Sequence, residues 1–247
     1  MSRGRSRTLL LALLALLLAA CTTKEEPAAL REPDSASRMR LANVAEASGQ
    51  PGVALQIYAV EATKSPDDMA AQARYAGALL RAGGVAQAED VLAQALAKAP
   101  NDPVLLNQEG RVQLLTGDAP GALATFDRVL ATKPSDAKAL SGKGVALDIM
   151  GRHTEALAAH AAAASLAPDN MSVMNNYAIS LMLAGRPNQA LDILRPLAAR
   201  ADAPKRVQNN LGLAYAAAGQ MSQAHDAVGD GIDLGQLDQY ALLMQAN

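Results

Sequence analysis

The stretch GKGVALDIMGRHTEAL, residues 142–157, contains the pattern that decides the fold. Its glycine at position 151 is one of six glycines spaced 34 residues apart, and each is followed five residues later by an alanine. The glycines are Gly49, Gly83, Gly117, Gly151, Gly185 and Gly219, and the alanines are Ala54, Ala88, Ala122, Ala156, Ala190 and Ala224. A period of about 20–50 residues is typical of solenoid and other repeat proteins.

Each part of this pattern has a physical reason. A glycine suits the end of a first helix, where the chain takes a positive φ. An alanine suits the crossing of two helices, because a larger side chain would push them apart. Prolines with the same spacing end four of the second helices: Pro66, Pro100, Pro134 and Pro168. We expect the polar residues beside them to cap the next helix. These expected caps are Asp67, Asn101, Ser135 and Asp169.

The period resembles the tetratricopeptide repeat over residues 35–238. Each unit would be a helix–turn–helix that buries its apolar face only by stacking on its neighbours. The resemblance implies an all-α, right-handed superhelix of about six repeats. Their bounds would be 35–68, 69–102, 103–136, 137–170, 171–204 and 205–238. The family carries a glycine at the eighth position of the repeat. This chain has that glycine in three repeats, as Gly110, Gly144 and Gly212.

Three features near the C-terminus depart from the repeat. Pro196 falls inside the second helix of the fifth repeat, and we expect it to kink or shorten that helix. Gly229, Gly231 and Gly235 weaken the second helix of the sixth repeat. Residues 237–247 begin with apolar side chains at helical spacing, which predicts a C-terminal capping helix.

Composition limits the class of function. The chain has 247 residues, of which half are hydrophobic, with 22 Lys and Arg against 24 Asp and Glu. This hydrophobic content and charge are typical of a folded protein. Nucleic acid is not expected as a partner, because binding phosphates needs clustered basic residues. A single cysteine excludes a disulfide framework and a cysteine-rich zinc module.

The sequence shows no motif for catalysis or for a metal. His160 lies seven residues after His153, two helical turns away and too far to share one metal ion without a further ligand. No HExxH, CxxC or glycine-rich phosphate motif occurs. We therefore predict no catalytic residue, no metal site, no small-molecule substrate and no cofactor, and the chain is predicted not to be an enzyme.

Residues 1–20 predict a signal peptide that is removed. Arginines at positions 3, 5 and 7 precede a run of twelve Leu and Ala residues, which is shorter than the about 20 needed to cross a bilayer. The ending Leu18-Ala19-Ala20-Cys21 resembles a bacterial lipobox. This resemblance implies cleavage between Ala20 and Cys21, with diacylglycerol and acyl groups added to Cys21. The alternative is an uncleaved signal anchor that ends in a buried cysteine.

The lipid would anchor a flexible connection to the repeats. Several acyl chains on one cysteine give lasting membrane attachment. Residues 21–34 lack apolar periodicity and predict a flexible tether about 20 Å in root-mean-square length. Thr22 stands where inner-membrane lipoproteins of enterobacteria carry Asp, so the resemblance implies the periplasmic face of the outer membrane.

A groove is the expected functional surface. In this architecture the first helices line the concave side, with repeat positions two, five, nine and twelve pointing inward. The candidate groove residues are Asn107, Arg111, Ser141, Val145, Asp148, Asn175, Ile179, Met182, Asn209 and Leu213. We expect the polar row to hydrogen-bond a peptide backbone and the apolar stripe to receive the apolar face of a helix. The polar row is Asn107, Ser141, Asn175 and Asn209, and the apolar stripe is Val145, Ile179 and Leu213. The alternative is that these residues pack between helices or are solvated.

Three segments carry a closer resemblance. GKGVALDIMGRHTEAL (142–157), NNYAISLMLAGRPNQALDILRPLA (175–198) and RVQNNLGLAYAAAG (206–219) resemble the TadD family of Tad (tight-adherence) pilus assembly lipoproteins. Val207 and Gly212 depart from that pattern without damaging the repeat. The resemblance implies a scaffold or chaperone for Tad (Flp) type IV pilus assembly, a pilotin that binds the outer-membrane secretin subunit or another Tad component.

Two other functions fit the same sequence. A general periplasmic tetratricopeptide lipoprotein would serve another envelope machine, such as a different secretin or a cell-wall enzyme. A membrane-surface spacer would have the repeats without any ligand in the groove.

Overall fold

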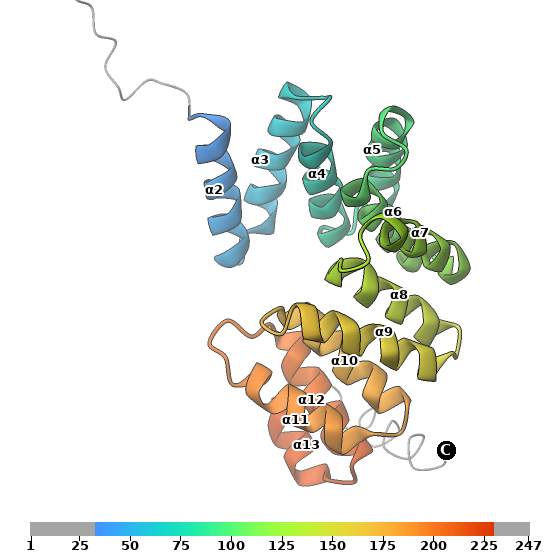
Figure 1. Cartoon of the computed structure of the whole chain (residues 1–247). Helices are drawn as coiled ribbons and strands as arrows, with labels where there is room; N and C mark the ends of the chain where they lie inside the picture. The colour runs from blue at the N-terminus through green and yellow to red at the C-terminus, as the bar shows by residue number, and fades with distance from the viewer. Residues whose placement is uncertain (1–32, 230–247) are drawn as a thin grey trace, which may run out of the picture. The chain divides into compact units, whose positions relative to one another are not determined.

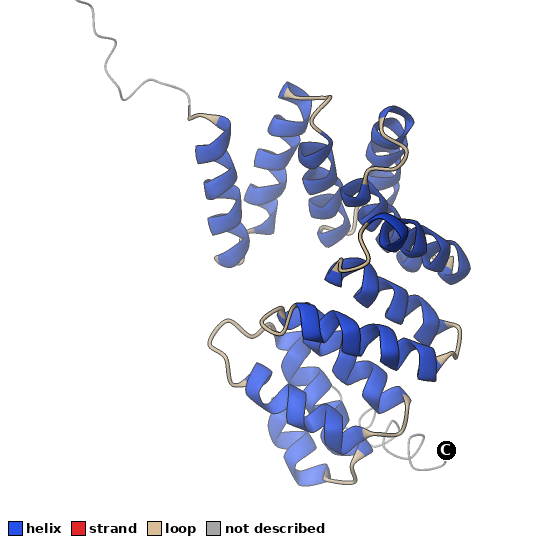
Figure 2. Ribbon diagram, in the orientation of Figure 1, coloured by secondary structure: helices blue, strands red, loops and turns tan. Residues whose placement is uncertain are grey.

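A computed structural model describes residues 33–229, which form twelve helices and no strand in that range (Figures 1 and 2). The first helices of the repeats are α2 (Ser35–Ala47), α4 (Met69–Arg81), α6 (Pro103–Leu115), α8 (Ala137–Ile149), α10 (Met171–Leu183) and α12 (Lys205–Ala217). The second helices are α3 (Pro51–Lys64), α5 (Val85–Lys98), α7 (Ala119–Thr132), α9 (His153–Leu166), α11 (Pro187–Ala198) and α13 (Met221–Val228). The all-α class and the 34-residue unit predicted from the sequence are therefore confirmed.

The chain divides into two units, residues 1–41 and 42–247. In the first unit the described residues are 33–41, where Asp34 Oδ1 accepts a hydrogen bond of 2.7 Å from the Ser37 amide at the start of α2. In the second unit the described residues are 42–229. The signal peptide, Cys21, most of the tether and the predicted cap at 237–247 lie outside the described residues.

The periodic glycines and alanines occupy the places that the sequence predicts for them. All six glycines have φ between 71° and 84°. At Gly151 the amide donates to the Asp148 carbonyl at 3.0 Å, and the Arg152 amide donates to the Leu147 carbonyl at 2.9 Å. This pair of bonds satisfies carbonyls that the end of α8 leaves open. The six alanines are buried, so helices cross closely at each of them.

The predicted helix caps are wrong by one residue. The capping side chains are Asp68, Asp102, Asp136 and Asn170. At Asp102 the carboxylate accepts the amides of Val104 at 2.8 Å and Leu105 at 3.0 Å. The reason lies in the turn: the Asp102 amide donates to the Ala99 carbonyl at 3.1 Å, which closes a four-residue turn. The polar residue directly after the proline lies inside this turn, and the next residue begins the helix.

Two of the predicted departures are confirmed within the described residues. The helix containing Pro196, α11, has 12 residues, whereas α9 has 14. The second helix of the sixth repeat, α13, has only eight residues and ends at Val228, where Gly229 takes a φ of 52°. A proline and a glycine therefore set the lengths of the last two second helices.

The first helices form the inner face of the stack. Within residues 42–229, α4 contacts α6, α6 contacts α8, α8 contacts α10 and α10 contacts α12. The second helices contact the first helices of their own and the next repeat, but do not contact one another to a comparable extent. The first helices therefore lie closer to one another than the second helices do. A ligand in the groove of these repeats would contact the first helices α4, α6, α8, α10 and α12.

Candidate partner-binding site

An apolar pocket of about 260 Å³ opens on α8 and α10, the first helices of the fourth and fifth repeats. It is lined by Val145, Asp148, Ile149, His160, Asn176, Ile179 and Leu183. The structure thus brings together three predicted groove residues, Val145, Asp148 and Ile179. We define these seven residues as the inner pocket.

The rim of the inner pocket is exposed and apolar. Ile149 is 58% exposed and Leu183 is 43% exposed, and each is the last residue of its helix. Leu115 ends α6 in the same way and is also exposed. The three residues are spaced by 34 and therefore occupy one repeat position in neighbouring helices. Exposed apolar side chains gathered at one pocket, as Ile149 and Leu183 are, mark interaction sites more often than single ones do.

The wall of the inner pocket contains one buried carboxylate. Asp148 Oδ1 lies 2.9 Å from His153 Nδ1, and Asp148 Oδ2 lies 3.3 Å from His160 Nε2. Burial by itself raises the pKa of Asp148, but interactions with His160, His153 and Ser180 outweigh it and hold the pKa below the ordinary value of 3.8. Asp148 is therefore a carboxylate at neutral pH.

His160 fills the space between α8 and α9. Its side chain is fully buried, and its ring lies so close to Gly144 that a Cβ there would be 2.5 Å from Nε2. Neither ring nitrogen has a well-aligned hydrogen bond within the described residues. The glycine at the eighth position of this repeat is thus required by the imidazole ring behind it.

The predicted polar row differs from an open groove surface. Asn107, Ser141 and Asn175 are buried. Ser141 Oγ accepts from Asn176 Nδ2 at 3.2 Å, and Asn175 Oδ1 accepts from Asn210 Nδ2 at 2.8 Å. The prediction that these three side chains lie open to a ligand is therefore corrected. Ser141 and Asn175 accept hydrogen bonds from the first helix of the next repeat, whereas Asn107 donates to a backbone carbonyl of its own helix at 3.0 Å.

The remaining predicted groove residues vary in exposure. Met182 is buried in the core that α10 shares with α11, and Leu213 packs partly against that core. Asn209 is half-buried, with its Oδ1 atom enclosed. Arg111 is half-buried on α6 and donates to Gln108 Oε1 at 2.7 Å. Of these four residues, only Arg111 offers a charge at the inner face.

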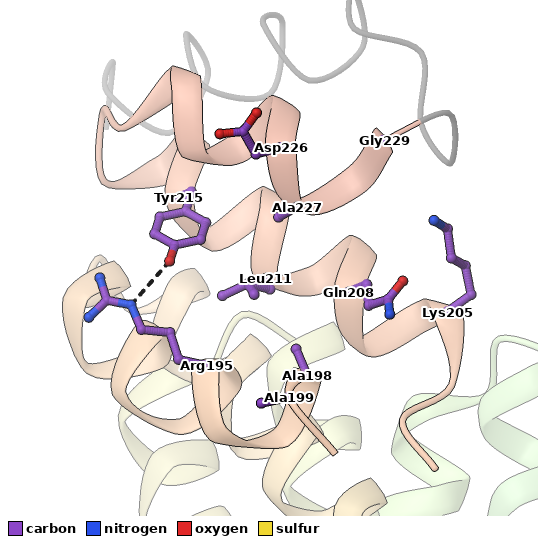
Figure 3. Close-up of a pocket in the computed structure, with 10 residues that line it drawn as sticks. All are labelled: Arg195, Ala198, Ala199, Lys205, Gln208, Leu211, Tyr215, Asp226, Ala227 and Gly229. Carbon is purple, nitrogen blue, oxygen red and sulfur yellow. Dashed lines mark hydrogen bonds between the residues drawn. The ribbon is translucent and has the colours of Figure 1, made fainter. Parts of the chain in front are cut away.

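A second hollow, of about 580 Å³, lies among α11, α12 and α13 (Figure 3). Arg195 Nε donates to the Tyr215 hydroxyl at 3.2 Å, and the guanidinium lies 5.4 Å from the centre of the tyrosine ring. Lys205 Nζ donates to the Val228 carbonyl at 3.1 Å. Gly229, on the rim of this hollow, is the last described residue.

The described residues contain no arrangement suited to a metal ion and no helix long and apolar enough to cross a membrane. A serine, a histidine and an aspartate do meet beside the inner pocket, as Ser180, His160 and Asp148. The side chain of Ser180 is fully buried, so its hydroxyl is closed to an approaching substrate. This cluster is part of the packing between helices.

Comparison with known proteins identifies the family. Two models described as tetratricopeptide repeat match residues 45–108 and 107–170, which together make up just over half of the chain. The chain belongs to the tetratricopeptide-repeat family, and its fold is the all-α superhelix of that family. It is a scaffold of the kind that binds other proteins. No curated protein matches the sequence significantly.

Several solved structures share this fold. A tetratricopeptide repeat protein from Parabacteroides merdae is 16% identical, with a TM-score of 0.60 over 90% of this chain and 87% of that one. A thermophilic repeat protein of Thermus thermophilus is 18% identical, with a TM-score of 0.64 over 73% and 98%. PilW, a widely conserved type IV pilus biogenesis factor, is 19% identical, with a TM-score of 0.57 over 87% and 92%. At these identities the likeness concerns the fold.

Four residues of the inner pocket were missed by reasoning from the sequence: Ile149, His160, Asn176 and Leu183. Ile149 and Leu183 carry a usable signal, because large apolar residues recur at the last position of three first helices. His160 carries none, since it belongs to a second helix and its spacing in the sequence does not reveal that its ring packs against Gly144 of the first helix.

Proposed function

We propose that this chain is a lipid-anchored, non-enzymatic scaffold for assembly of a Tad (Flp) type IV pilus. In this proposal it acts as a pilotin, and its inner pocket binds a segment of the outer-membrane secretin subunit. The observation that carries the binding part is the pocket itself, in which the exposed side chains of Ile149 and Leu183 stand beside Val145 and Ile179.

The pocket suits one apolar anchor of a partner. A partner side chain placed between α8 and α10 would remove both its own surface and the exposed surface of Ile149 and Leu183 from water. Burial of a Leu- or Ile-sized side chain contributes about 1.5–3 kcal/mol. Such a contact is weak alone, but a membrane tether raises the local concentration of the partner to about the millimolar range.

The envelope setting rests on the sequence. The lipobox-like stretch before Cys21 would attach the chain to the outer membrane, with the repeats in the periplasm. The resemblance of residues 103–220 to Tad assembly lipoproteins supports the pilus system as the setting. PilW, which shares the fold, is a type IV pilus biogenesis factor, and this is consistent with the proposal.

The test measures heat-resistant secretin multimers in outer-membrane fractions from cells without the chain, with the wild type, with Cys21→Ser and with Ile149→Asp. We expect multimers to require both the lipidated cysteine and the pocket residue. The matched control is Leu166→Asp, which places the same charge at an exposed apolar residue that ends a second helix, outside the pocket.

Unchanged multimers in cells without the chain would refute the pilotin role. The chain would then serve a later pilus step or another envelope machine, which is the alternative function. Multimers that depend on Cys21 but tolerate Ile149→Asp would leave the anchor in place and refute the inner pocket as the binding site.

A further inference from the structure

The fourth repeat carries two ionisable side chains at core positions that are apolar in its neighbours. His160 of α9 occupies the repeat position of four buried apolar residues, Leu92, Phe126, Leu194 and Val228. Asp148 of α8 occupies the repeat position of Leu80, Leu114, Met182 and Ala216. Apolar residues of similar volume are often as stable as a buried ion pair, or more stable. The fourth repeat therefore keeps a polar pair where packing alone favours an apolar one, which is typical of a functional site.

A second histidine joins this pair through the same carboxylate. Asp148 Oδ1 lies 2.9 Å from His153 Nδ1, Asp148 Oδ2 lies 3.3 Å from His160 Nε2, and the Ser180 hydroxyl of α10 also acts on the carboxylate. Asp148 and His160 line the inner pocket, with side chains that are 8% and 0% exposed. His153 does not line the pocket and its side chain is 36% exposed. The cluster thus extends from the wall of the pocket to solvent.

Asp148 is the counter-charge that both histidines face. The helices packed against α9 are α8 and α10, and α10 has no charged residue; its titratable side chain is Tyr177. The other charged side chains of α8 and α9 lie in surface ion pairs or in the first turn of α8. They are Lys143 with Asp127 at 2.7 Å, Glu155 with Arg152 at 2.7 Å, and the exposed Lys138. Within the described part of these three helices, the histidines therefore share one carboxylate.

A partner side chain in the inner pocket would remove water from Asp148. A buried carboxylate without a counter-ion is costly, and a cation bonded to it offsets that cost. Asp148 itself stays ionised near neutral pH, because its interactions hold its pKa below 3.8. Histidine is the side chain that gains a positive charge as pH falls from about 8 to about 5. The proton therefore goes to an imidazole, and the ring of His153 is the one that solvent reaches.

We propose that binding of a partner segment at the inner pocket is linked to the uptake of a proton by His153. The proton comes from solvent, the ring becomes an imidazolium, and its Nδ1–H donates to Asp148 Oδ1. His160 holds the other carboxylate oxygen at the wall of the pocket. Because such coupling is reciprocal, the bound proton raises the affinity of the pocket for its partner. An apolar segment is then held more tightly at about pH 6 than at about pH 8.

This regulation rests on the proposed use of the inner pocket, so the probes are pocket-dependent peptides. Short random peptides displayed on phage are selected on the full-length chain in detergent, and those whose binding Ile149→Asp abolishes are kept. Members without Asp, Glu, His or Cys are synthesised with blocked ends, so that only the protein titrates between about pH 6 and about pH 8. For wild type we expect roughly three- to tenfold tighter binding at the lower pH.

The variant His153→Gln isolates the linkage. Glutamine keeps a hydrogen-bond donor beside Asp148 but has no titratable group, and residue 153 does not line the pocket. We expect this variant to bind with one affinity at both pH values, near that of wild type at about pH 8. The matched control is His225→Gln, which removes the remaining histidine, on α13 and outside the inner pocket, and should keep the full pH dependence.

Proton uptake can also be measured directly in the wild type. Titration calorimetry of one peptide in two buffers with different ionisation enthalpies gives the number of protons bound with the peptide. We expect an uptake of a fraction of a proton at about pH 7 for wild type and for His225→Gln, and none for His153→Gln. Thermal unfolding at both pH values confirms that each variant is folded.

The outcomes separate the two proposals. Pocket-dependent peptides that bind equally at both pH values, without proton uptake, overturn the linkage and leave the pocket in place. Weaker binding at the lower pH overturns it as well, and so does a pH dependence that survives in His153→Gln. If no peptide depends on Ile149, the inner pocket fails as a binding site and the linkage fails with it.

Discussion

Replacing Gly144 by alanine tests the packing behind the inner pocket. The new methyl carbon would lie 2.5 Å from Nε2, 2.6 Å from Cδ2 and 2.7 Å from Cε1 of His160. The ring is fully buried and rigid, so it relieves the overlap only by moving between α8 and α9. Overpacking of this kind costs about 1–3 kcal/mol, and contact with three ring atoms indicates the upper end of that range.

Helix propensity acts in the opposite direction. Alanine is about 1 kcal/mol better than glycine in a helix interior. The net expectation for Gly144→Ala is therefore a loss of about 2 kcal/mol, which lowers Tm by roughly 4–8 °C in a protein of this size. The measurement is thermal unfolding followed by circular dichroism of the helices.

Gly77→Ala is the matched control. It adds the same methyl group inside α4, where the nearest atoms lie 3.3 Å away at the flexible end of Gln108. We expect its Tm to equal or exceed that of wild type. The double variant Gly144→Ala with His160→Ala should be more stable than the sum of the two single effects, because removing the ring removes the overlap. A Gly144→Ala protein as stable as the Gly77→Ala protein would refute this reasoning.

Three further predictions follow from the same structure. Ile149→Asp should abolish binding of pocket-dependent peptides while changing stability by less than about 0.5 kcal/mol, because the side chain is exposed; a parallel loss of helical signal on mild heating would show that the residue acts on folding. Asp136→Ala should cost about 1 kcal/mol by removing the cap of α8, whereas Ser135→Ala should be nearly neutral; equal urea midpoints for the two variants would contradict the corrected cap position. Because interactions lower the pKa of Asp148, its contribution to stability is present above its ordinary value of 3.8 and is lost as pH falls through its folded-state pKa; urea unfolding at pH 7 and at about pH 3 should therefore show a smaller loss for Asp148→Asn than for wild type, and equal losses would remove Asp148 from the acid response.

The partner-binding site was predicted only in part. Val145, Asp148 and Ile179 were found because a fixed repeat position faces the same side in every unit, and the inner pocket contains all three. The same rule failed for Ser141 and Asn175, whose hydrogen bonds go to Asn176 and Asn210 in the following repeat. A repeat position specifies a face of a helix, but it does not specify whether a neighbour covers that face.

The sequence alone determined the helices and the repeat. Glycine at positive φ and proline after a second helix act through the backbone of adjacent residues, and the alanine at each helix crossing recurs at a fixed distance from the glycine. Their spacing can therefore be recognised without the fold. The tertiary structure alone decided which side chains stay open. His160 of α9 packs against Gly144 and lines the pocket, and Asn176 of α10 donates to the Ser141 hydroxyl. Both depend on side chains of different helices meeting in space, which local spacing does not encode.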